Sequence, residues 1–148
     1  MRSAETKSSR SIMNRPRIVL LTGVLVLGLG LSIGPASRAG APSVGLLDGQ
    51  TFSGELGEKG KAQGDKDEFI FKGGTFRSAA CDAYGFGEAA YSARQAGNVV
   101  SFEATTRSEK EGTMTWKGKA AGDRLEGTAV WEKGNRPTEY WFKGTVKH

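Results

Sequence analysis

Apolar and polar residues alternate with a period of two along most of residues 51–147. Successive side chains of a β-strand point to opposite faces, so this period predicts strands with one buried and one solvated face. The alternation is most regular in four segments near the carboxyl terminus: residues 98–107, 113–121, 124–133 and 138–147. Shorter alternating segments cover residues 51–56, 68–72 and 75–80. The pattern therefore predicts an all-β fold.

Residues 88–95 fit two structures. Their Ala, Glu, Arg and Gln favour helix, whereas Ala89, Tyr91 and Ala93 alternate as in a strand. Because predicted strands lie on both sides, we expect a strand here, which brings the number of strands to about eight. The alternative is a β-sandwich with one short helix near 88–95.

The joints between the predicted strands are short and rich in turn residues. Gly73-Gly74 suits a two-residue hairpin, because both positions tolerate positive φ. Short joints make neighbouring strands antiparallel. About eight such strands in roughly 100 residues match a small up-and-down barrel. The longest joint, residues 57–66, is charged and Gly-rich, and we expect it to be an exposed loop.

A short motif recurs in the strands: a large apolar residue, any residue, then Gly. It occurs as Phe52-Ser53-Gly54, Trp116-Lys117-Gly118, Leu125-Glu126-Gly127 and Phe142-Lys143-Gly144. The Gly shares the face of the bulky residue, so it makes room for a ring from the next strand or allows the sheet to coil strongly. Both uses favour a closed barrel.

The succession of strands, with Trp131 and Phe142-Lys143-Gly144 near its end, resembles the lipocalin-like (calycin-type) barrels of exported bacterial proteins. The resemblance covers most of residues 49–148. It implies a barrel that binds rather than catalyses, and it assigns no binding residue.

Residues 18–34 form an uncharged apolar run of seventeen positions. Basic residues precede the run, and Ser37-Arg38-Ala39 follows it with small residues at the positions that a signal peptidase requires. We expect residues 1–39 to be a signal peptide cleaved after Ala39, with translation starting at Met1 or Met13. The alternative is an uncleaved anchor, but a spanning helix needs about 20 apolar residues.

This prediction divides the chain into three parts: the signal peptide 1–39, a flexible lead-in 40–48 and a single barrel domain 49–148. It places the protein in the periplasm or outside the cell. Any contact with a membrane would then be through the signal segment, if that segment stays uncleaved.

The excess of positive charge belongs to the predicted signal peptide. The whole chain carries 21 basic and 16 acidic residues, of which six basic residues and one acid lie in residues 1–39. The remaining part has 15 of each and a net charge of zero. Nucleic-acid binding normally requires an excess of positive charge on the folded domain, so we do not expect it here.

The sequence predicts neither catalysis nor a metal or other cofactor. It has one His, the terminal His148, and one Cys, Cys81, which are too few for a catalytic triad or a zinc site. The segment Asp65-Lys66-Asp67-Glu68 lacks the ligand spacing of a calcium loop, and we expect a solvated charged turn. Glu103 and Glu126 are carboxylates on predicted solvent faces, so we expect surface charges rather than an acid–base pair.

The candidate partner is a small apolar ligand inside the barrel. The residues expected to bind it form an inward stripe: Phe102, Met114, Trp116, Trp131, Tyr140 and Phe142. A candidate mouth loop is rich in small residues and contains Cys81, Asp82, Tyr84 and Phe86. An eight-stranded barrel can also be filled by its own side chains, so the volume of the interior decides this hypothesis.

The alternative function is an envelope protein-interaction or structural module without a small-molecule site. It depends on Trp141, which is expected to point outward, as a contact surface or sugar-stacking platform or packed under the lead-in. It also depends on Cys81, which has no second Cys in the chain to pair with. Cys81 is expected to be a buried small hydrophobe or to form a disulfide dimer with a second copy.

Overall fold

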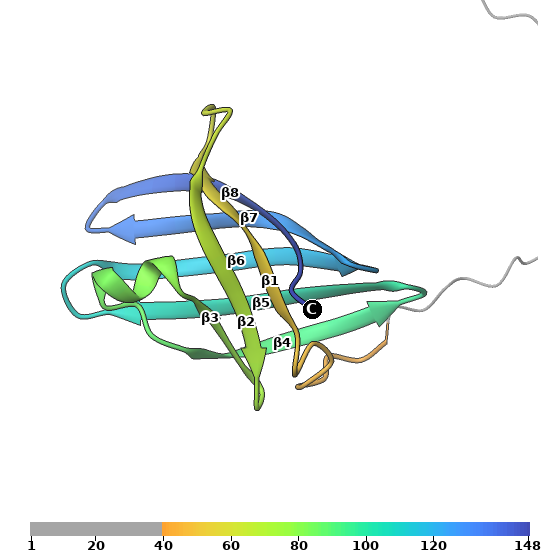
Figure 1. The fold of residues 1–148 in the computed structure, drawn as a ribbon. Helices are drawn as coiled ribbons and strands as arrows, with labels where there is room; N and C mark the ends of the chain where they lie inside the picture. The colour runs from red at the N-terminus through yellow and green to blue at the C-terminus, as the bar shows by residue number, and fades with distance from the viewer. Residues whose placement is uncertain (1–39) are drawn as a thin grey trace, which may run out of the picture. The chain divides into compact units, whose positions relative to one another are not determined.

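The computed structural model describes residues 40–148, so the predicted signal peptide lies outside the described residues. Eight strands pair antiparallel in chain order, and β1 pairs with β8, which closes the sheet into a barrel (Figure 1). The strands are β1 (Thr51–Glu58), β2 (Asp65–Lys72), β3 (Thr75–Ser78), β4 (Ala89–Ala96), β5 (Val99–Ser108), β6 (Gly112–Ala121), β7 (Arg124–Lys133) and β8 (Arg136–Val146). The predicted up-and-down barrel is confirmed.

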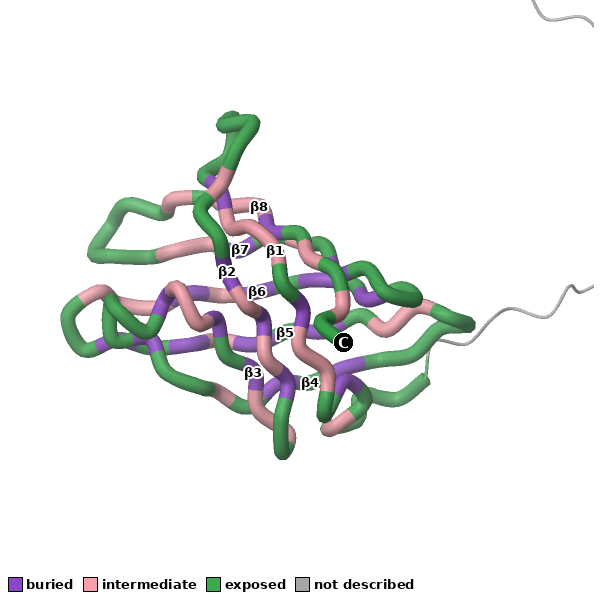
Figure 2. The backbone as a smooth tube through the Cα atoms, viewed as in Figure 1, coloured by how far each residue is buried: buried purple, intermediate pink, exposed green. Residues whose placement is uncertain are grey.

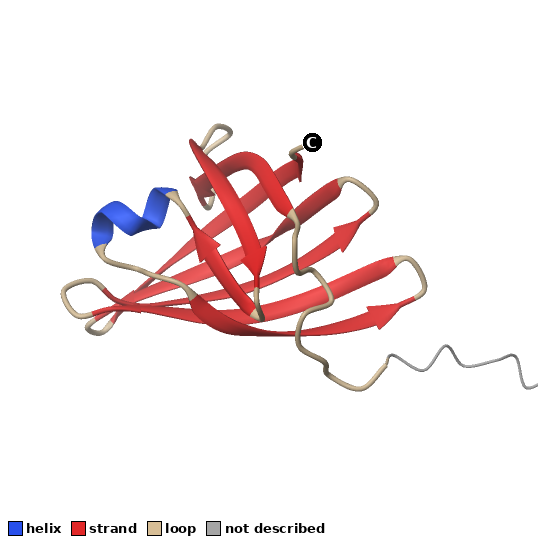
Figure 3. Ribbon diagram, turned by 60° about the horizontal axis from the view of Figure 1, so that its bottom comes forward, coloured by secondary structure: helices blue, strands red, loops and turns tan. Residues whose placement is uncertain are grey.

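The ambiguous segment 88–95 is a strand. It forms most of β4, and the helix near it is a short 3-10 turn, η1 (Ala80–Tyr84), that precedes β4 (Figure 3). The sandwich alternative is therefore wrong. The strand prevails because Tyr91 and Ala93 face inward and are buried, as a period of two requires.

The joints between successive strands lie alternately at the two ends of the barrel. At one end, the mouth, lie the β1–β2 loop, η1, and the β5–β6 and β7–β8 turns. At the other end lie the β2–β3, β4–β5 and β6–β7 turns together with the lead-in. The β2–β3 turn has Gly73 at φ 60° and Gly74 at φ 78°, so both positions take the positive φ expected of this hairpin.

Residues 40–48 pair with β4 where the pairing between β3 and β4 ends. β3 and β4 share only two pairs, Thr75 with Ala90 and Phe76 with Ala89. Beyond them, the Ser43 amide donates to the Ala93 carbonyl at 2.8 Å, and the Ala93 amide donates back at 2.9 Å. The lead-in therefore supplies hydrogen-bond partners to backbone groups of β4 that β3 is too short to reach.

Buried and exposed residues alternate along the strands (Figure 2). The inward residues meet in one hydrophobic core that is dominated by aromatic rings. Phe71 is at its centre, with ring centroids 4.9 Å from Phe102, 5.1 Å from Tyr91 and 5.2 Å from Phe76. Such spacing is typical of favourable aromatic pairs.

The inward glycines make room for these rings. A Cβ atom added at Gly118 would lie 2.5 Å from Phe102 Cε1 and 2.7 Å from Phe142 Cζ. A Cβ atom at Gly127 would lie 2.5 Å from Phe142 Cζ. Both distances are far below van der Waals contact, so the ring of Phe142 fits only because two facing positions have no side chain. This confirms one of the two uses proposed for the recurring motif.

The outer face carries charges of alternating sign across the strands. Glu126 lies opposite Lys119 on β6 and Lys143 on β8, and Glu55 lies opposite Lys143 and Lys66. Exposed ion pairs such as these contribute little to stability individually. Opposite charges in facing positions nevertheless favour this register over one in which like charges meet.

The start of β2 differs from the prediction. Asp65-Lys66-Asp67-Glu68 is not a solvated turn, because all four residues lie on β2 and Asp67 is 6% exposed. Asp67 shares its face with Phe69 and Phe71, so the alternation that marks the strand extends through the charged residues. β1 also continues to Glu58, which leaves the loop as residues 59–64 only.

We predict that Gly118→Ala destabilises the barrel by about 1–3 kcal/mol, the usual cost of overpacking. The physical reason is the clash of the new methyl group with the rings of Phe102 and Phe142. Denaturant unfolding measures the change. Gly87→Ala is the matched control, because no atom lies within 4 Å of a Cβ at Gly87, and it should change stability by less than about 0.5 kcal/mol.

The double variant Gly118→Ala/Phe142→Leu tests the cause. If the methyl group displaces the Phe142 ring, the double variant is less destabilised than the sum of the single variants. Additive effects would show that Gly118 is required for another reason.

Candidate functional site

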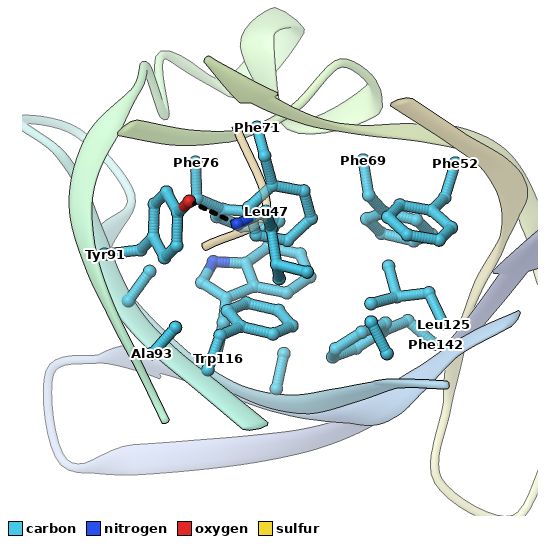
Figure 4. Close-up of a cluster of buried hydrophobic side chains, with 14 of the residues drawn as sticks. Leu47, Phe52, Phe69, Phe71, Phe76, Tyr91, Ala93, Trp116, Leu125 and Phe142 are labelled. Carbon is cyan, nitrogen blue, oxygen red and sulfur yellow. Dashed lines mark hydrogen bonds between the residues drawn. The ribbon is translucent and has the colours of Figure 1, made fainter. Parts of the chain in front are cut away.

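Aromatic rings fill the middle of the barrel (Figure 4). Trp116 is fully buried, and its ring centroid lies 5.1 Å from that of Phe76 and 5.6 Å from that of Phe142. The rings of Phe102 and Phe142 are 6.1 Å apart. Three of the six residues predicted to bind a ligand, Phe102, Trp116 and Phe142, are thus core residues that contact one another and neighbouring rings.

The end opposite the mouth is plugged by the lead-in. Leu47 is 1% exposed, and its amide donates a hydrogen bond of 2.9 Å to the Tyr91 hydroxyl, which is drawn in Figure 4. The same hydroxyl donates to Asp48 Oδ1 at 2.9 Å. Burial, together with the nearby Asp48 carboxylate, raises the pKa of Tyr91 to about 12, so the phenol stays protonated and donates.

The mouth contains a cavity of about 220 Å³. Its lining residues come from five strands, the η1 turn and two joints: Leu56, Asp65, Ala80, Cys81, Tyr84, Phe86, Glu111, Met114, Trp131 and Tyr140. Two wider depressions, of about 730 and 810 Å³, lie largely on the outer wall, among charged side chains. The mouth cavity is the more enclosed and the more aromatic, so we take it as the candidate site.

The inner wall of the cavity is apolar and soft. Cys81 and Met114 are both buried, with Cys81 Sγ 3.9 Å from Met114 Sδ. Burial raises the pKa of the Cys81 thiol to about 11, so it is a thiol rather than a thiolate at neutral pH. Burial also raises the pKa of Tyr140, and the carboxylate of Glu58 acts in the same direction.

The rim of the cavity is held by β7 and the β5–β6 turn. Trp131 Nε1 donates to the Glu111 carbonyl oxygen at 2.6 Å, and Lys133 Nζ lies 2.7 Å from Glu111 Oε2. The only hydrogen-bond donor of the indole is therefore used within the protein. What Trp131 offers to the cavity is the surface of its ring.

Asp67 holds the η1 turn over the mouth. Its carboxylate accepts hydrogen bonds from Ser78 Oγ at 2.5 Å, the Ala80 amide at 2.9 Å and the Glu68 amide at 2.7 Å. Ser108 Oγ donates to the Tyr84 carbonyl at 2.8 Å and fixes the other end of the turn. The residues that η1 contributes to the cavity are thus positioned by a buried carboxylate on β2.

The predicted site residues separate into three groups. Met114, Trp131 and Tyr140 line the cavity, as do Cys81, Tyr84 and Phe86 of the mouth loop. Phe102, Trp116 and Phe142 lie deeper, in the filled core. Asp82 does not line the cavity, because its carboxylate pairs with Arg77 at 2.7 Å and ties η1 to β3.

The sequence reasoning missed the polar residues of the site. Asp65 and Glu111 line the cavity, and Asp67 supports it from behind. The alternation of Asp65, Asp67, Phe69 and Phe71 was the signal for the two aspartates, because it places both on the face of the two phenylalanines, although only Asp67 is buried.

The outward residues have structural partners. Trp141 covers Gly57, and its Nε1 donates to the Lys61 carbonyl at 3.0 Å, so it packs on the β1–β2 loop and not under the lead-in. Glu103 is paired with Lys117 on the solvent face at 3.7 Å. Within residues 40–148 no group of three or more His, Cys, Asp or Glu side chains is arranged to hold a metal ion. In the same range, no helix has the length and hydropathy to cross a membrane.

We predict that Asp67 makes stability depend on pH. Burial is the main cause that raises the pKa of this carboxyl above its ordinary value of 3.8. As pH rises from that value through the folded pKa, the unfolded chain releases its proton first, so the free energy of unfolding falls, by at most about 1.4 kcal/mol per pH unit.

Asp67→Asn should remove this slope, measured by denaturant unfolding across the acidic range. Asp123→Asn, which removes an exposed carboxyl at the plugged end, is the control and should keep the slope. Parallel curves for Asp67→Asn and the unchanged protein would contradict the prediction.

We also predict that Cys81 does not form a disulfide dimer in the folded protein. The thiol is 6% exposed and its pKa is about 11, so alkylation should be at least about tenfold slower than in the denatured chain. Reaction with a thiol reagent and non-reducing electrophoresis measure this. A band of dimer size that disappears on reduction would refute it.

Comparison of the chain with protein-family models, with curated proteins and with solved structures finds no match. The candidate site therefore stands on its geometry: an aromatic cavity at one end of a barrel whose other end is plugged and whose middle is filled.

Proposed function

We propose that this chain is an exported, non-enzymatic barrel that binds a small, largely apolar ligand in the mouth cavity. The observation that carries the proposal is the partly enclosed space of about 220 Å³ between η1 and the ends of the strands. An apolar cavity of about 150 Å³ is large enough to take up benzene. The mode is lipocalin-like, with the ligand entering at one end of the barrel, but it sits at the mouth because the rings below fill the interior.

The chemistry of the lining favours binding over catalysis. Cys81 is the thiol of the lining, and its raised pKa keeps it unreactive as a nucleophile. Glu103 and Glu126, the carboxylates weighed as an acid–base pair, face solvent on the outer wall. Small-molecule sites are typically aromatic clefts with a few polar groups, which describes the mouth.

The structure of the outer wall gives less support to a protein-interaction module. Trp141, on which that alternative depended, uses its indole nitrogen and one ring face within the chain. Cys81, its second support, is buried. We therefore propose ligand binding as the function and keep an envelope partner as the alternative.

The three tryptophans allow a direct test by NMR. The indole N–H signals of Trp116, Trp131 and Trp141 report the core, the cavity and the outer wall, and each is assigned by a Trp→Phe variant. We expect tert-butylbenzene to shift the Trp131 signal in a saturable way and to leave that of Trp141 unchanged. If no signal responds, the proposed function is wrong.

A pair of variants on one turn locates the site. Ala80 lines the cavity and Ala83 is exposed on the same η1 turn. Ala80→Phe should fill the cavity and weaken binding at least about tenfold, whereas Ala83→Phe should bind as the unchanged protein does. Equal binding by both variants would place the ligand elsewhere, and unfolding curves show that each variant is folded.

A further inference from the structure

We infer that the mouth cavity selects a positively charged ligand: a small amine or quaternary ammonium ion with an apolar body. This inference rests on the proposed function and names the class of ligand that the same site takes. It follows from which side chains line the cavity and from what their polar groups already do.

The charges that line the cavity are all negative. Asp65 and Glu111 are the charged residues of the lining, and no Lys, Arg or His belongs to it. The part of the chain after residue 39 has equal numbers of acidic and basic residues, so this one-sided lining does not reflect an acidic protein. A cation that enters the mouth is attracted by the Asp65 carboxylate, whereas an anion is repelled by it.

Asp65 is the carboxylate best placed for an external cation. It lies on the inward face of β2, in register with Leu56 and on the same face as Asp67 and Phe69. Among the described residues it makes no ion pair within 4.0 Å, whereas Glu111 is neutralised by Lys133 at 2.7 Å. Asp65 is exposed at the rim of the cavity, so its charge is stable in solvent and can attract a cation that approaches the mouth.

The aromatic lining suits the same ligand. Tyr84, Phe86, Trp131 and Tyr140 make up four of the ten lining residues. The faces of aromatic rings attract ammonium groups, and protein sites for quaternary ammonium ions are built from several such rings. The Trp131 N–H is already bonded to the Glu111 carbonyl, so this ring has no donor left with which to bind an anion.

The chain itself shows an ammonium group in this environment. Lys133 Nζ lies 6.0 Å from the centre of the Trp131 ring and 2.7 Å from Glu111 Oε2. The combination of an indole face and a carboxylate at the rim thus already accommodates one ammonium group. The lining on the side of Asp65, Tyr84 and Tyr140 offers the same two kinds of group to a second one.

A pair of isosteric probes tests the inference. Phenyltrimethylammonium and tert-butylbenzene have the same shape and differ in a charged nitrogen in place of a carbon. Titration is followed by the Trp131 indole signal at low ionic strength. We expect the cation to bind about tenfold more tightly, and added salt to reduce the difference.

Matched variants identify the source of the preference. Asp65→Asn should bring the affinities of the two probes close together, whereas Asp123→Asn, which removes the same charge at the plugged end, should keep the preference. Tyr84→Leu should weaken binding of the cation more than Tyr84→Phe, which preserves the ring.

The outcomes separate the two proposals. Equal or tighter binding of the neutral probe overturns the charge preference and leaves the proposed function standing. Equal loss of preference in Asp65→Asn and Asp123→Asn also overturns it, because the attraction would then come from the overall charge. Failure of both probes to shift the Trp131 signal overturns the proposed function and this inference with it.

Discussion

The barrel closes around rings that fit only because the positions facing them have no side chain. The ring of Phe142 occupies the space that a Cβ at Gly118 or Gly127 would need. Gly54 and Gly144 allow β1 and β8 to approach in the same way, since a Cβ at Gly54 would lie 1.8 Å from the Lys143 carbonyl oxygen. Protein interiors pack as densely as organic crystals, so ring and glycine form one unit of packing across the strands.

This packing decides where a ligand can go. A filled centre separates the two ends of the barrel, and only one of these ends is plugged. Leu47 and Asp48 plug one end through Tyr91. The other end is roofed by the η1 turn, which Asp67 and Ser108 fasten to the barrel without filling the space beneath it. Of the three cavities described for residues 40–148, the one at the mouth is the most enclosed, and a small molecule of the proposed kind would lie there.

Electrostatics distinguish the mouth from the wall. On the outer wall one row of exposed charges alternates in sign from strand to strand, as Glu126 does between Lys119 and Lys143. That arrangement favours the register and presents little net field to solvent. At the mouth, Asp65 faces inward without such a partner among the described residues. A local departure from an otherwise balanced charge pattern is typical of a binding site, where recognition takes precedence over stability.

The order and type of the strands followed from the sequence, because the side chains of a strand alternate between core and solvent and the turns need Gly at positive φ. Gly73-Gly74 shows this, since local chemistry alone predicted that turn. Residues 88–95 fitted helix as well as strand, and the predicted strands on both sides decided in favour of a strand. Closure of the barrel also followed, because about eight strands joined by short turns have few other arrangements.

The site depended on contacts between residues far apart in the chain. Phe102 and Met114 have the same inward pattern, yet one fills the core and the other lines a cavity. The burial of Asp67 and the plug at Leu47 likewise depend on partners 13 and 44 residues away. The sequence by itself determined which face of each strand is buried. Only the tertiary structure decided which buried residues leave space between them, because volume depends on register and closure rather than on the local pattern.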